Sequence, residues 1–299
     1  MYRFIKRIGN GAFGKLLPSS LTRFQSAKHT CSKNLWHLNS FDRMFIRNQE
    51  VAIKVESIDS KDPQLKNEAK IYSILKGAVG FPSLRWIGIG SRYTALVMDL
   101  LGCSLDRQLS ARGKFSLKSV LMLADQMLHS AGFVHRDIKP GNFVMGRGSS
   151  SHIVHMIDFG LSCRYRTDDY QHIPYTEGQP LVGTACYSSI CTHLGIQQTR
   201  RDDLESLCYM LISFLTGTLP WLGIRAESKL EKHQIMAERK IRTPLDKLCK
   251  SLPEEFIFFL TYIRALRYKD RPDYEHIRKM FRNLFIRKGY RLDMCFDWS

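Results

Sequence analysis

Apolar and polar positions alternate in the stretch Val51-Ala52-Ile53-Lys54-Val55. A period of two is typical of a β-strand, and it predicts that the three β-branched residues share one face while Ala52 and Lys54 share the other. The apolar run 95–98 predicts a second strand. The residues that follow, 99–102, have the character of a linker between two lobes.

Elsewhere the hydrophobic positions recur with the helical period of about 3.6 residues. Before the linker, one helix is predicted over 63–76, with Glu68 near its middle. After the linker the pattern is mostly helical, and Ser116 and Gly217 are typical of a helix start and a helix end. We predict helices over 116–128, 203–215, 226–240, 253–266 and 274–285. A small β-rich part followed by a larger helical part indicates the α+β class.

A long segment separates Gly14 from Val51, although hairpin loops usually have about 2–5 residues. It is rich in Ser, Arg and Lys and shows no clear periodicity. We therefore interpret residues 16–49 as an irregular insertion.

Composition narrows the choice of partners and compartment. Lys and Arg total 45 against 28 acidic residues, a formal charge of +17, which suits an acidic protein, a nucleic acid or an anionic membrane surface. No nucleic-acid-binding motif accompanies the charge, so we favour acidic protein substrates. The eight cysteines include no C-x-x-C pair, which indicates neither a zinc site nor a disulfide framework. We expect an intracellular protein of the cytoplasm or nucleus, without a transmembrane segment.

The stretch His135-Arg136-Asp137-Ile138-Lys139-Pro140-Gly141-Asn142 resembles the catalytic loop of protein kinases, H-R-D-x-x-x-x-N, in residue type and spacing. Transfer of a γ-phosphoryl group needs a carboxylate that orients the attacking hydroxyl and accepts its proton, and Asp137 is placed for that. Lys139 can reach the transferred phosphate as a point charge, and Asn142 can supply an oxygen to a metal ion. Three polar residues can also form an ordinary loop, so the interpretation depends on further motifs.

Two such motifs are present. Asp158-Phe159-Gly160 follows the apolar run 153–157, which predicts a buried strand that ends beside a metal-binding carboxylate, Asp158. The stretch Ile8-Gly9-Asn10-Gly11-Ala12-Phe13-Gly14 has the form G-x-G-x-x-G, in which glycines let backbone amides approach phosphate oxygens. Lys54 can then pair with the phosphates, with Glu68 as its candidate partner.

Several longer stretches resemble the casein kinase 1 family. They include Leu100-Leu101-Gly102-Cys103-Ser104-Leu105, Gln171-His172-Ile173-Pro174-Tyr175, the residues from 192 to 207, Leu219-Pro220-Trp221, and the ending 282–299. The family carries S-I-N where other protein kinases have A-P-E, and Ser189-Ile190-Cys191 stands in that place. The resemblance covers nearly the whole chain outside residues 16–49.

The resemblance implies a two-lobed protein kinase fold of the α+β class. The N-lobe, 1–98, would be small and β-rich with one helix, the hinge would be 99–102, and the C-lobe, 103–299, would be larger and mainly α-helical. It implies a monomeric serine/threonine kinase that transfers the γ-phosphate of Mg-ATP to acidic or pre-phosphorylated proteins. Nucleic acid is not an expected partner.

The resemblance also implies the site residues. Asp137, Lys139 and Asn142 would be catalytic, Asn142 and Asp158 would bind Mg²⁺, and Asp203 would anchor the catalytic loop. ATP would be bound by Ile8, Gly9, Gly11, Ala12, Phe13, Gly14, Ala52, Lys54, Glu68, Met98, Asp99 and Leu101. A pocket for a substrate anion would be formed by Cys186, Gly223 and Lys232.

The chain departs from the family pattern at three places besides its C-terminal end. The first is the insertion after Gly14. The second is the helix before His135, which is shorter by about six residues, or roughly 9 Å of helix. The third is Gly183-Thr184-Ala185-Cys186-Tyr187, where Cys186 replaces an arginine of the family's G-T-A-R-Y.

Two functions remain open from the sequence. A complete set of Lys54, Glu68, Asp137, Asn142 and Asp158 favours an active kinase. The shortened helix favours a catalytically impaired, kinase-like module that binds nucleotide or partners, because a misplacement of ~1 Å can cost about 10²-fold in rate.

Overall fold

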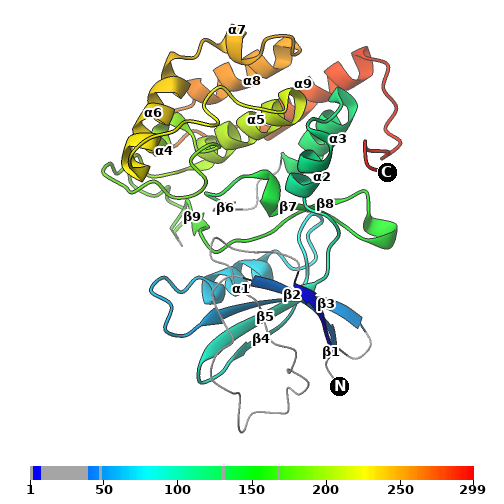
Figure 1. Ribbon diagram of the computed structural model, residues 1–299. Helices are drawn as coiled ribbons and strands as arrows, with labels where there is room; N and C mark the ends of the chain where they lie inside the picture. Colours follow the sequence, from blue (N-terminus) through cyan, green and yellow to red (C-terminus); the bar gives the residue numbers. More distant parts are fainter. Residues whose placement is uncertain (1–2, 8–39, 47–48, 129–131, 168) are drawn as a thin grey trace. The chain divides into compact units, whose positions relative to one another are not determined.

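The computed structural model describes residues 3–7, 40–46, 49–128, 132–167 and 169–299, and the chain divides into two compact units (Figure 1). Unit 1 comprises residues 1–102, 146–148 and 155–160. Unit 2 comprises residues 103–145, 149–154 and 161–299. Unit 1 is built on an antiparallel sheet with one helix and unit 2 is mainly helical, which confirms the predicted α+β class.

The described residues of unit 1 form a five-stranded antiparallel sheet in the order β1-β2-β3-β5-β4. The strands are β1 (Arg3–Arg7), β2 (Ser40–Ile46), β3 (Gln49–Ser57), β4 (Leu84–Ile89) and β5 (Tyr93–Asp99). The register of β3 and β5 sets Ala52 opposite Met98 and Lys54 opposite Leu96. The strands predicted at 51–55 and 95–98 are therefore neighbours in this sheet, and the strand predicted at 153–157 is found at Val154–Met156, outside it.

The prediction of an irregular insertion over residues 16–49 is wrong in part, because the structure has strand β2 there. The C-terminal part of the expected insertion 16–49 is not irregular, because Ser40–Ile46 pairs with β3 along its whole length and Gln49 already belongs to β3. Two adjacent charged residues, Asp42 and Arg43, interrupt the alternation that would have indicated a strand. Pairing with β1 and β3 outweighs this weak local preference. The rest of the prediction falls on residues 16–39 and 47–48, which lie outside the described residues.

Helix α1 (Leu65–Ile74) lies against β4 and β5, and its start is fixed by β3. Gln64 makes no side-chain cap; instead the Glu56 carboxylate of β3 accepts hydrogen bonds from the backbone N–H groups of Gln64 and Leu65, at 2.8 and 3.0 Å. A carboxylate at this end satisfies free N–H groups and complements the helix dipole. Lys54 shares a face of β3 with Glu56, so the same face directs Lys54 toward Glu68, one turn along α1.

Helix α5 (Arg200–Thr216) is the centre of unit 2 and is buried along most of its length. It begins with a capping box of Thr199 and Asp202, and it ends at Gly217, whose φ of +77° favours glycine. Helices α3 (Leu117–Met127) and α8 (Glu254–Ala265) pack against it, and α9 (Tyr274–Arg287) packs against α3 and α8. The predicted helices are all present, with ends shifted by a few residues.

The other helices are α2 (Leu105–Arg112), α4 (Ile190–His193), α6 (Lys229–Arg242) and α7 (Leu245–Leu248). The short strands are β6 (Phe133–Val134), β7 (Phe143–Met145), β8 (Val154–Met156) and β9 (Cys163–Arg164), and 3₁₀ turns cover Pro140–Asn142 and Gly148–Ser150. Helix α2 was not predicted because it buries little of its surface: Leu105 is its buried residue. Within the described ranges, no helix is long and apolar enough to cross a membrane.

Candidate active site

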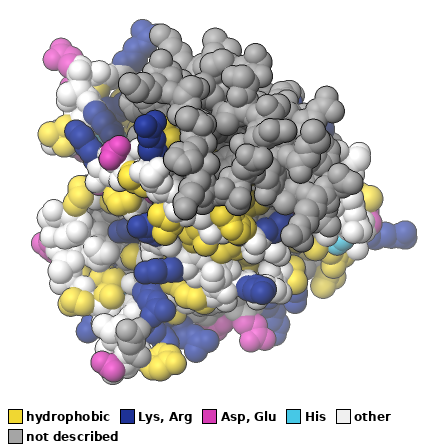
Figure 2. All heavy atoms as spheres, turned by 90° about the horizontal axis from the view of Figure 1, so that it is seen from below, with side chains coloured by type: hydrophobic (Ala, Val, Ile, Leu, Met, Phe, Trp, Pro, Cys, Tyr) yellow, Lys and Arg dark blue, Asp and Glu magenta, His cyan; other side chains and the backbone are white. Residues whose placement is uncertain are grey.

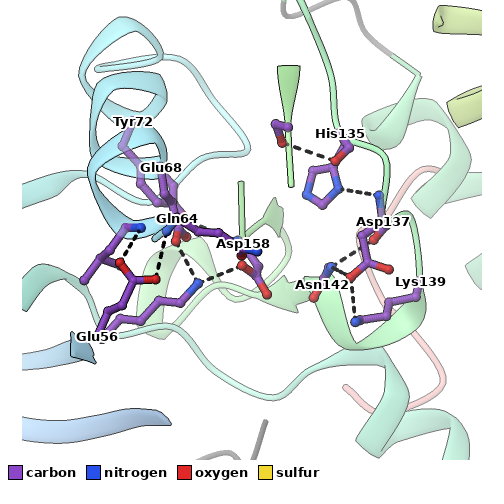
Figure 3. A network of polar contacts seen from close by, with 12 residues as sticks. Glu56, Gln64, Glu68, Tyr72, His135, Asp137, Lys139, Asn142 and Asp158 are labelled. Atoms are coloured by element: carbon purple, nitrogen blue, oxygen red, sulfur yellow. Dashed lines mark hydrogen bonds and ion pairs between the residues drawn. The ribbon is translucent and has the colours of Figure 1, made fainter. Parts of the chain in front are cut away.

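A buried ammonium lies between two carboxylates in unit 1. The Lys54 Nζ is 2.7 Å from Glu68 Oε2 of α1 and 2.7 Å from Asp158 Oδ1, just after β8 (Figure 3). Lys54 and Glu68 are almost fully buried, whereas the Asp158 side chain is 34% exposed. The ion pair of Lys54 and Glu68 predicted from the sequence is therefore present, and Asp158 completes it on the side that solvent reaches.

Burial and charge act in opposite directions on this cluster. Burial alone would lower the pKa of the Lys54 ammonium, but the Glu68 and Asp158 carboxylates outweigh it and hold that pKa above its usual value. Burial raises the pKa of the Glu68 carboxyl, and the Lys54 charge opposes that rise. Lys54 thus stays cationic at neutral pH, as a group that pairs with phosphate oxygens must be.

The backbone at Asp158 is held in an uncommon conformation. Asp158 has φ +67°, which costs a residue other than glycine on the order of 1–3 kcal/mol unless its surroundings impose it. Its N–H donates to the Tyr72 hydroxyl at 3.2 Å, and Phe159 packs edge-on against the Tyr72 ring. A Cβ on Gly160 would lie 2.4 Å from Gln64 Oε1, the end of a flexible side chain that would have to move aside. These contacts fix the direction of the Asp158 carboxylate.

The carboxylate of Asp137 in unit 2 is held by several side chains. Lys139 Nζ lies 2.6 Å from Asp137 Oδ2, and Asn142 Nδ2 donates to Asp137 Oδ2 at 3.1 Å and to its backbone oxygen at 2.8 Å (Figure 3). The Thr184 hydroxyl donates to Asp137 Oδ1 at 2.6 Å. Because the Asn142 amide nitrogen is used in this way, its side-chain oxygen remains as an acceptor for a cation.

The Thr184 contact requires a close approach of two backbones. Gly183 has φ +94°, and a Cβ at this position would lie 2.1 Å from the Arg136 carbonyl oxygen. Glycine therefore allows the segment around residue 183 to lie directly on the catalytic loop. The sequence does not indicate that Thr184 contacts Asp137, because the two residues are 47 positions apart in the chain.

The start of the catalytic loop is anchored to the central helix. Asp203 of α5 accepts hydrogen bonds from the backbone N–H groups of His135 and Arg136, at 2.5 and 2.9 Å. Burial raises the pKa of the Asp203 carboxyl to about 7, and the two N–H donors oppose that rise. Arg136 has φ +66°, and its Nε donates to the Leu161 carbonyl oxygen. The loop is thus tied to α5 at its first two residues.

The remaining ATP-binding residues predicted from the sequence divide into two groups. Ile8, Gly9, Gly11, Ala12, Phe13 and Gly14 lie outside the described residues. Ala52 and Met98 are buried opposite each other in β3 and β5. Asp99 is the last residue of β5, and its backbone N–H donates to the Ser83 carbonyl oxygen at 3.2 Å. Because this N–H is already used, the Asp99 carbonyl oxygen is better suited than the N–H to contact an adenine edge. Leu101 lies half-buried two residues further on.

The residues predicted to bind a substrate anion lie in unit 2. Cys186 is half-buried, and burial raises the pKa of its thiol, so it carries no charge at neutral pH. Gly223 is exposed with φ +73°, and Lys232 is exposed on α6. The structure adds a basic side chain that the sequence pattern does not indicate: the buried Lys240 of α6 acts electrostatically on Cys186.

Unit 1 is an antiparallel sheet with one helix, and unit 2 is mainly helical. Unit 1 holds a buried Lys-Glu ion pair, and unit 2 holds a loop whose aspartate is bound by a lysine and an asparagine. These features define a phosphotransferase with the protein kinase fold. Residues 2–281 match the family described as protein kinase domain. The chain belongs to the protein kinase family.

Proposed function

We propose that this protein is an active serine/threonine kinase of the casein kinase 1 type, which phosphorylates acidic or pre-phosphorylated proteins. The observation that carries the proposal is the Asp137 carboxylate, which Lys139, Asn142 and Thr184 hold in one orientation. The intact cluster of Lys54, Glu68 and Asp158 in unit 1 supports it. Inactive relatives would be expected to lack at least one of these groups.

In this proposal Asp137 orients the attacking hydroxyl and accepts its proton. Lys139 neutralises charge that develops on the transferred group, and Lys54 pairs with the other phosphates. The donor set suits Mg-ATP, because Mg²⁺ prefers oxygen ligands and is usually held by one or two side chains together with phosphates and water. The partly exposed Asp158 carboxylate and the Asn142 side-chain oxygen would be those ligands. Bound Mg-ATP supplies the phosphoryl group and the charge that offsets its negative oxygens.

Support for the casein kinase 1 type comes from the stretches that resemble that family. Ser189 of the Ser189-Ile190-Cys191 motif accepts from the Thr192 N–H at 3.0 Å and donates to Asp202 at 2.6 Å, so it caps α4 and ties it to the start of α5. In the Gln171–Tyr175 stretch, His172 and Tyr175 both pack against the Tyr268 ring. The Tyr268 hydroxyl donates to the Pro174 carbonyl oxygen at 2.9 Å.

The choice of acidic substrates rests on charge. The chain carries a formal charge of +17, and Figure 2 shows Lys and Arg side chains spread over the described part of one face, among hydrophobic side chains. A positive field draws acidic partners to the protein and raises the rate of encounter. Lys232 supplies a local cation on α6, whereas the neutral Cys186 thiol does not.

A phosphorylation assay tests the proposal. Wild-type protein is incubated with Mg-ATP and a dephosphorylated acidic protein, and the modified residues are identified by mass spectrometry. We expect phosphoserine and phosphothreonine within acidic stretches, and none with Asp137→Asn. Phosphotyrosine as the main product would contradict the serine/threonine assignment, and equal labelling of a basic protein would contradict the acidic preference.

The second candidate is a kinase-like module that binds nucleotide without turnover. It is favoured by the short connection from the end of α3 at Met127 to the start of β6 at Phe133. Against it stands the anchor of the catalytic loop on α5, where Asp203 accepts hydrogen bonds from the backbone N–H groups of His135 and Arg136. Nucleotide binding without phosphate transfer to any acidic substrate would establish this second candidate.

A further inference from the structure

A buried lysine outside the catalytic loop binds the segment that carries Thr184. Lys240 of α6 is fully buried, and its Nζ donates to the Ala185 carbonyl oxygen at 2.8 Å and to the Ser188 carbonyl oxygen at 2.5 Å. The same nitrogen is 3.1 Å from His193 Nε2. His193 Nε2 also lies 3.0 Å from the Ala185 carbonyl oxygen, so the two carbonyl oxygens are the acceptors that fix Lys240 whichever ring nitrogen carries the proton.

The surroundings of Lys240 offset part of the effect of burial on its charge. Its Nζ lies 5.1 Å from the centre of the Tyr209 ring and 5.2 Å from that of Trp221, within cation–π range. Burial lowers the pKa of Lys240 to about 7, and the Glu205 carboxylate is the largest influence that opposes the fall. The neighbouring His193 is neutral at pH 7, since burial lowers its pKa to about 4.

The backbone oxygens of the segment 184–188 are bound from several sides. The Cys186 oxygen accepts from Trp221 Nε1 at 2.7 Å, and the Thr184 oxygen accepts from the Tyr187 N–H at 2.9 Å. Lys240 holds the oxygens of residues 185 and 188. At the beginning of this segment, the Thr184 hydroxyl donates to Asp137 Oδ1. A chain of direct contacts therefore leads from α6 to the carboxylate of the catalytic loop.

We propose that Lys240 is a positioning residue for phosphoryl transfer: its ammonium ties the segment 184–188 to α6 and thereby keeps Thr184 on Asp137. The inference rests on the activity proposed above. In this role Lys240 contacts neither the substrate nor the reacting atoms and acts through the backbone of the segment 184–188. Without the ammonium, the Ser188 carbonyl oxygen would lose its Lys240 donor and the Ala185 oxygen would be left with His193 Nε2, so the segment would move to replace the lost hydrogen bonds.

The tether is tested first without any turnover. Cys186 lies within the segment and is half-buried, whereas Cys295 is exposed and serves as an internal reference. The alkylation rate of each thiol is measured by mass spectrometry in wild type, Lys240→Met and the control Arg242→Met. Arg242 lies on the same helix, 80% exposed, and has a loose 3.8 Å ion pair with Glu238. We expect alkylation of Cys186 to be about tenfold faster or more in Lys240→Met, because charge-assisted hydrogen bonds are lost, and unchanged in Arg242→Met.

The link to catalysis is tested by a double-mutant cycle. Lys240→Met should lower kcat by about tenfold and leave the KM for ATP unchanged, since ATP is bound mainly by other residues. In a Thr184→Ala background the same substitution should lower kcat by less than about threefold, because the contact it protects is already gone. If Lys240→Met does not fold, Lys240→Gln, which keeps an amide donor, is measured in the same assays.

The outcomes separate this inference from the proposed function. An unchanged alkylation rate of Cys186 in the lysine variant overturns the tether. Alkylation of Cys186 could be faster in Lys240→Met while this substitution lowers kcat equally in the wild-type and Thr184→Ala backgrounds. That result overturns the route through Thr184. If wild type shows no phosphate transfer at all, the proposed function fails, and the alkylation rates still decide whether Lys240 holds the segment.

Discussion

Single buried charges in this protein are stabilised in three different ways. Lys54 is paired with two carboxylates, Asp203 accepts from two backbone N–H groups, and Lys240 donates to two backbone oxygens. A buried charge without such partners would cost several kcal/mol. Each of these residues therefore also fixes the segments that it joins. Lys54 joins β3 to α1, Asp203 joins α5 to the catalytic loop, and Lys240 joins α6 to the segment 184–188.

The burial of Lys240 predicts a particular dependence of stability on pH. The pKa of Lys240 is lowered from 10.5 to about 7 in the folded protein, so the folded state releases this proton more readily than the unfolded state. Stability should therefore rise with pH between about 7 and 10, by at most about 1.4 kcal/mol per pH unit from this group. The charged or titratable groups around it are Glu205, Cys186, Arg264, His193 and His233.

Denaturant unfolding of wild type and Lys240→Met at a series of pH values measures this effect. We expect wild type to gain stability relative to the variant as pH rises through that range, and Arg242→Met to follow wild type. Parallel curves for wild type and Lys240→Met would show that the lysine titrates normally.

Because residue 186 is a cysteine, we expect weak recognition of a phosphate group on the substrate. An arginine at this position would bind phosphate with two parallel hydrogen bonds, whereas a neutral thiol offers one weak donor. The loss of a charge-assisted hydrogen bond typically costs about 1.5–3 kcal/mol, or roughly tenfold to a hundredfold in discrimination. We expect the wild type to favour a pre-phosphorylated peptide less strongly than Cys186→Arg does.

Two peptides that differ by one phosphate upstream of the target serine measure this preference as a ratio of kcat/KM values. The ratio should increase in Cys186→Arg. If wild type already discriminates as strongly as the arginine variant, a neighbouring side chain such as Lys232 performs the recognition and the prediction is wrong.

Residues within contiguous motifs could be predicted from the sequence, and residues joined by long-range packing could not. Asp137, Lys139 and Asn142 lie within six positions of one another, so local spacing was sufficient to indicate their relation. The contact of Thr184 with Asp137 depends on the tertiary fold. Lys240 lies on a basic helix that suggests exposure, and its position four residues after the buried Met236 was the available signal.

At the scale of elements, β3 and α1 form one functional assembly. Glu56 fixes the start of α1, and Lys54, on the same face of β3, reaches Glu68 one turn later. A shift of α1 along its axis would break both interactions together. Their common dependence on β3 means that the neighbours of β3 in the sheet, β2 and β5, also support the site.

The position of β2 between β1 and β3 predicts how deletions in the expected insertion will behave. Removal of residues 18–37 should leave the sheet intact, because the remaining residues between β1 and β2 exceed what a hairpin connection requires. Removal of residues 18–46 should prevent folding of unit 1, because it deletes β2. Circular dichroism and thermal unfolding of the two variants compare them directly.

A cooperative unfolding transition in the longer deletion would show that the sheet does not need β2. Loss of folding in the shorter deletion would show that residues 18–37 contribute to the packing of unit 1.

Helices were predicted more completely than strands because their signals are longer. The repeated apolar face of α3, α8 and α9 extends over several turns, and caps such as Ser116, which accepts from the Ser119 N–H, mark their starts. Strand β2 depends on its partners rather than on its own pattern. The short α4 and α7 have a single turn each, too little for a periodic signal.

At the scale of the whole molecule, the two units contribute different parts of the proposed reaction. Unit 1 contributes the cation Lys54 and the proposed metal ligand Asp158, whereas unit 2 contributes Asp137 with its supporting side chains. Substitutions in the two units should therefore affect different steps. Asp158→Asn should weaken both Mg-ATP binding and turnover, while Asp137→Asn should affect turnover alone.

The most direct test of this account is to measure nucleotide binding and phosphate transfer side by side for wild type and Asp137→Asn. Asparagine fills the same space and can still contact Lys139 and Thr184, but it cannot accept the proton of the attacking hydroxyl. The account predicts that the variant binds Mg-ATP with nearly the affinity of wild type and transfers phosphate to an acidic protein at least about a hundredfold more slowly. Near-normal turnover of Asp137→Asn would contradict the assignment of Asp137 as the base, and with it the proposed mechanism.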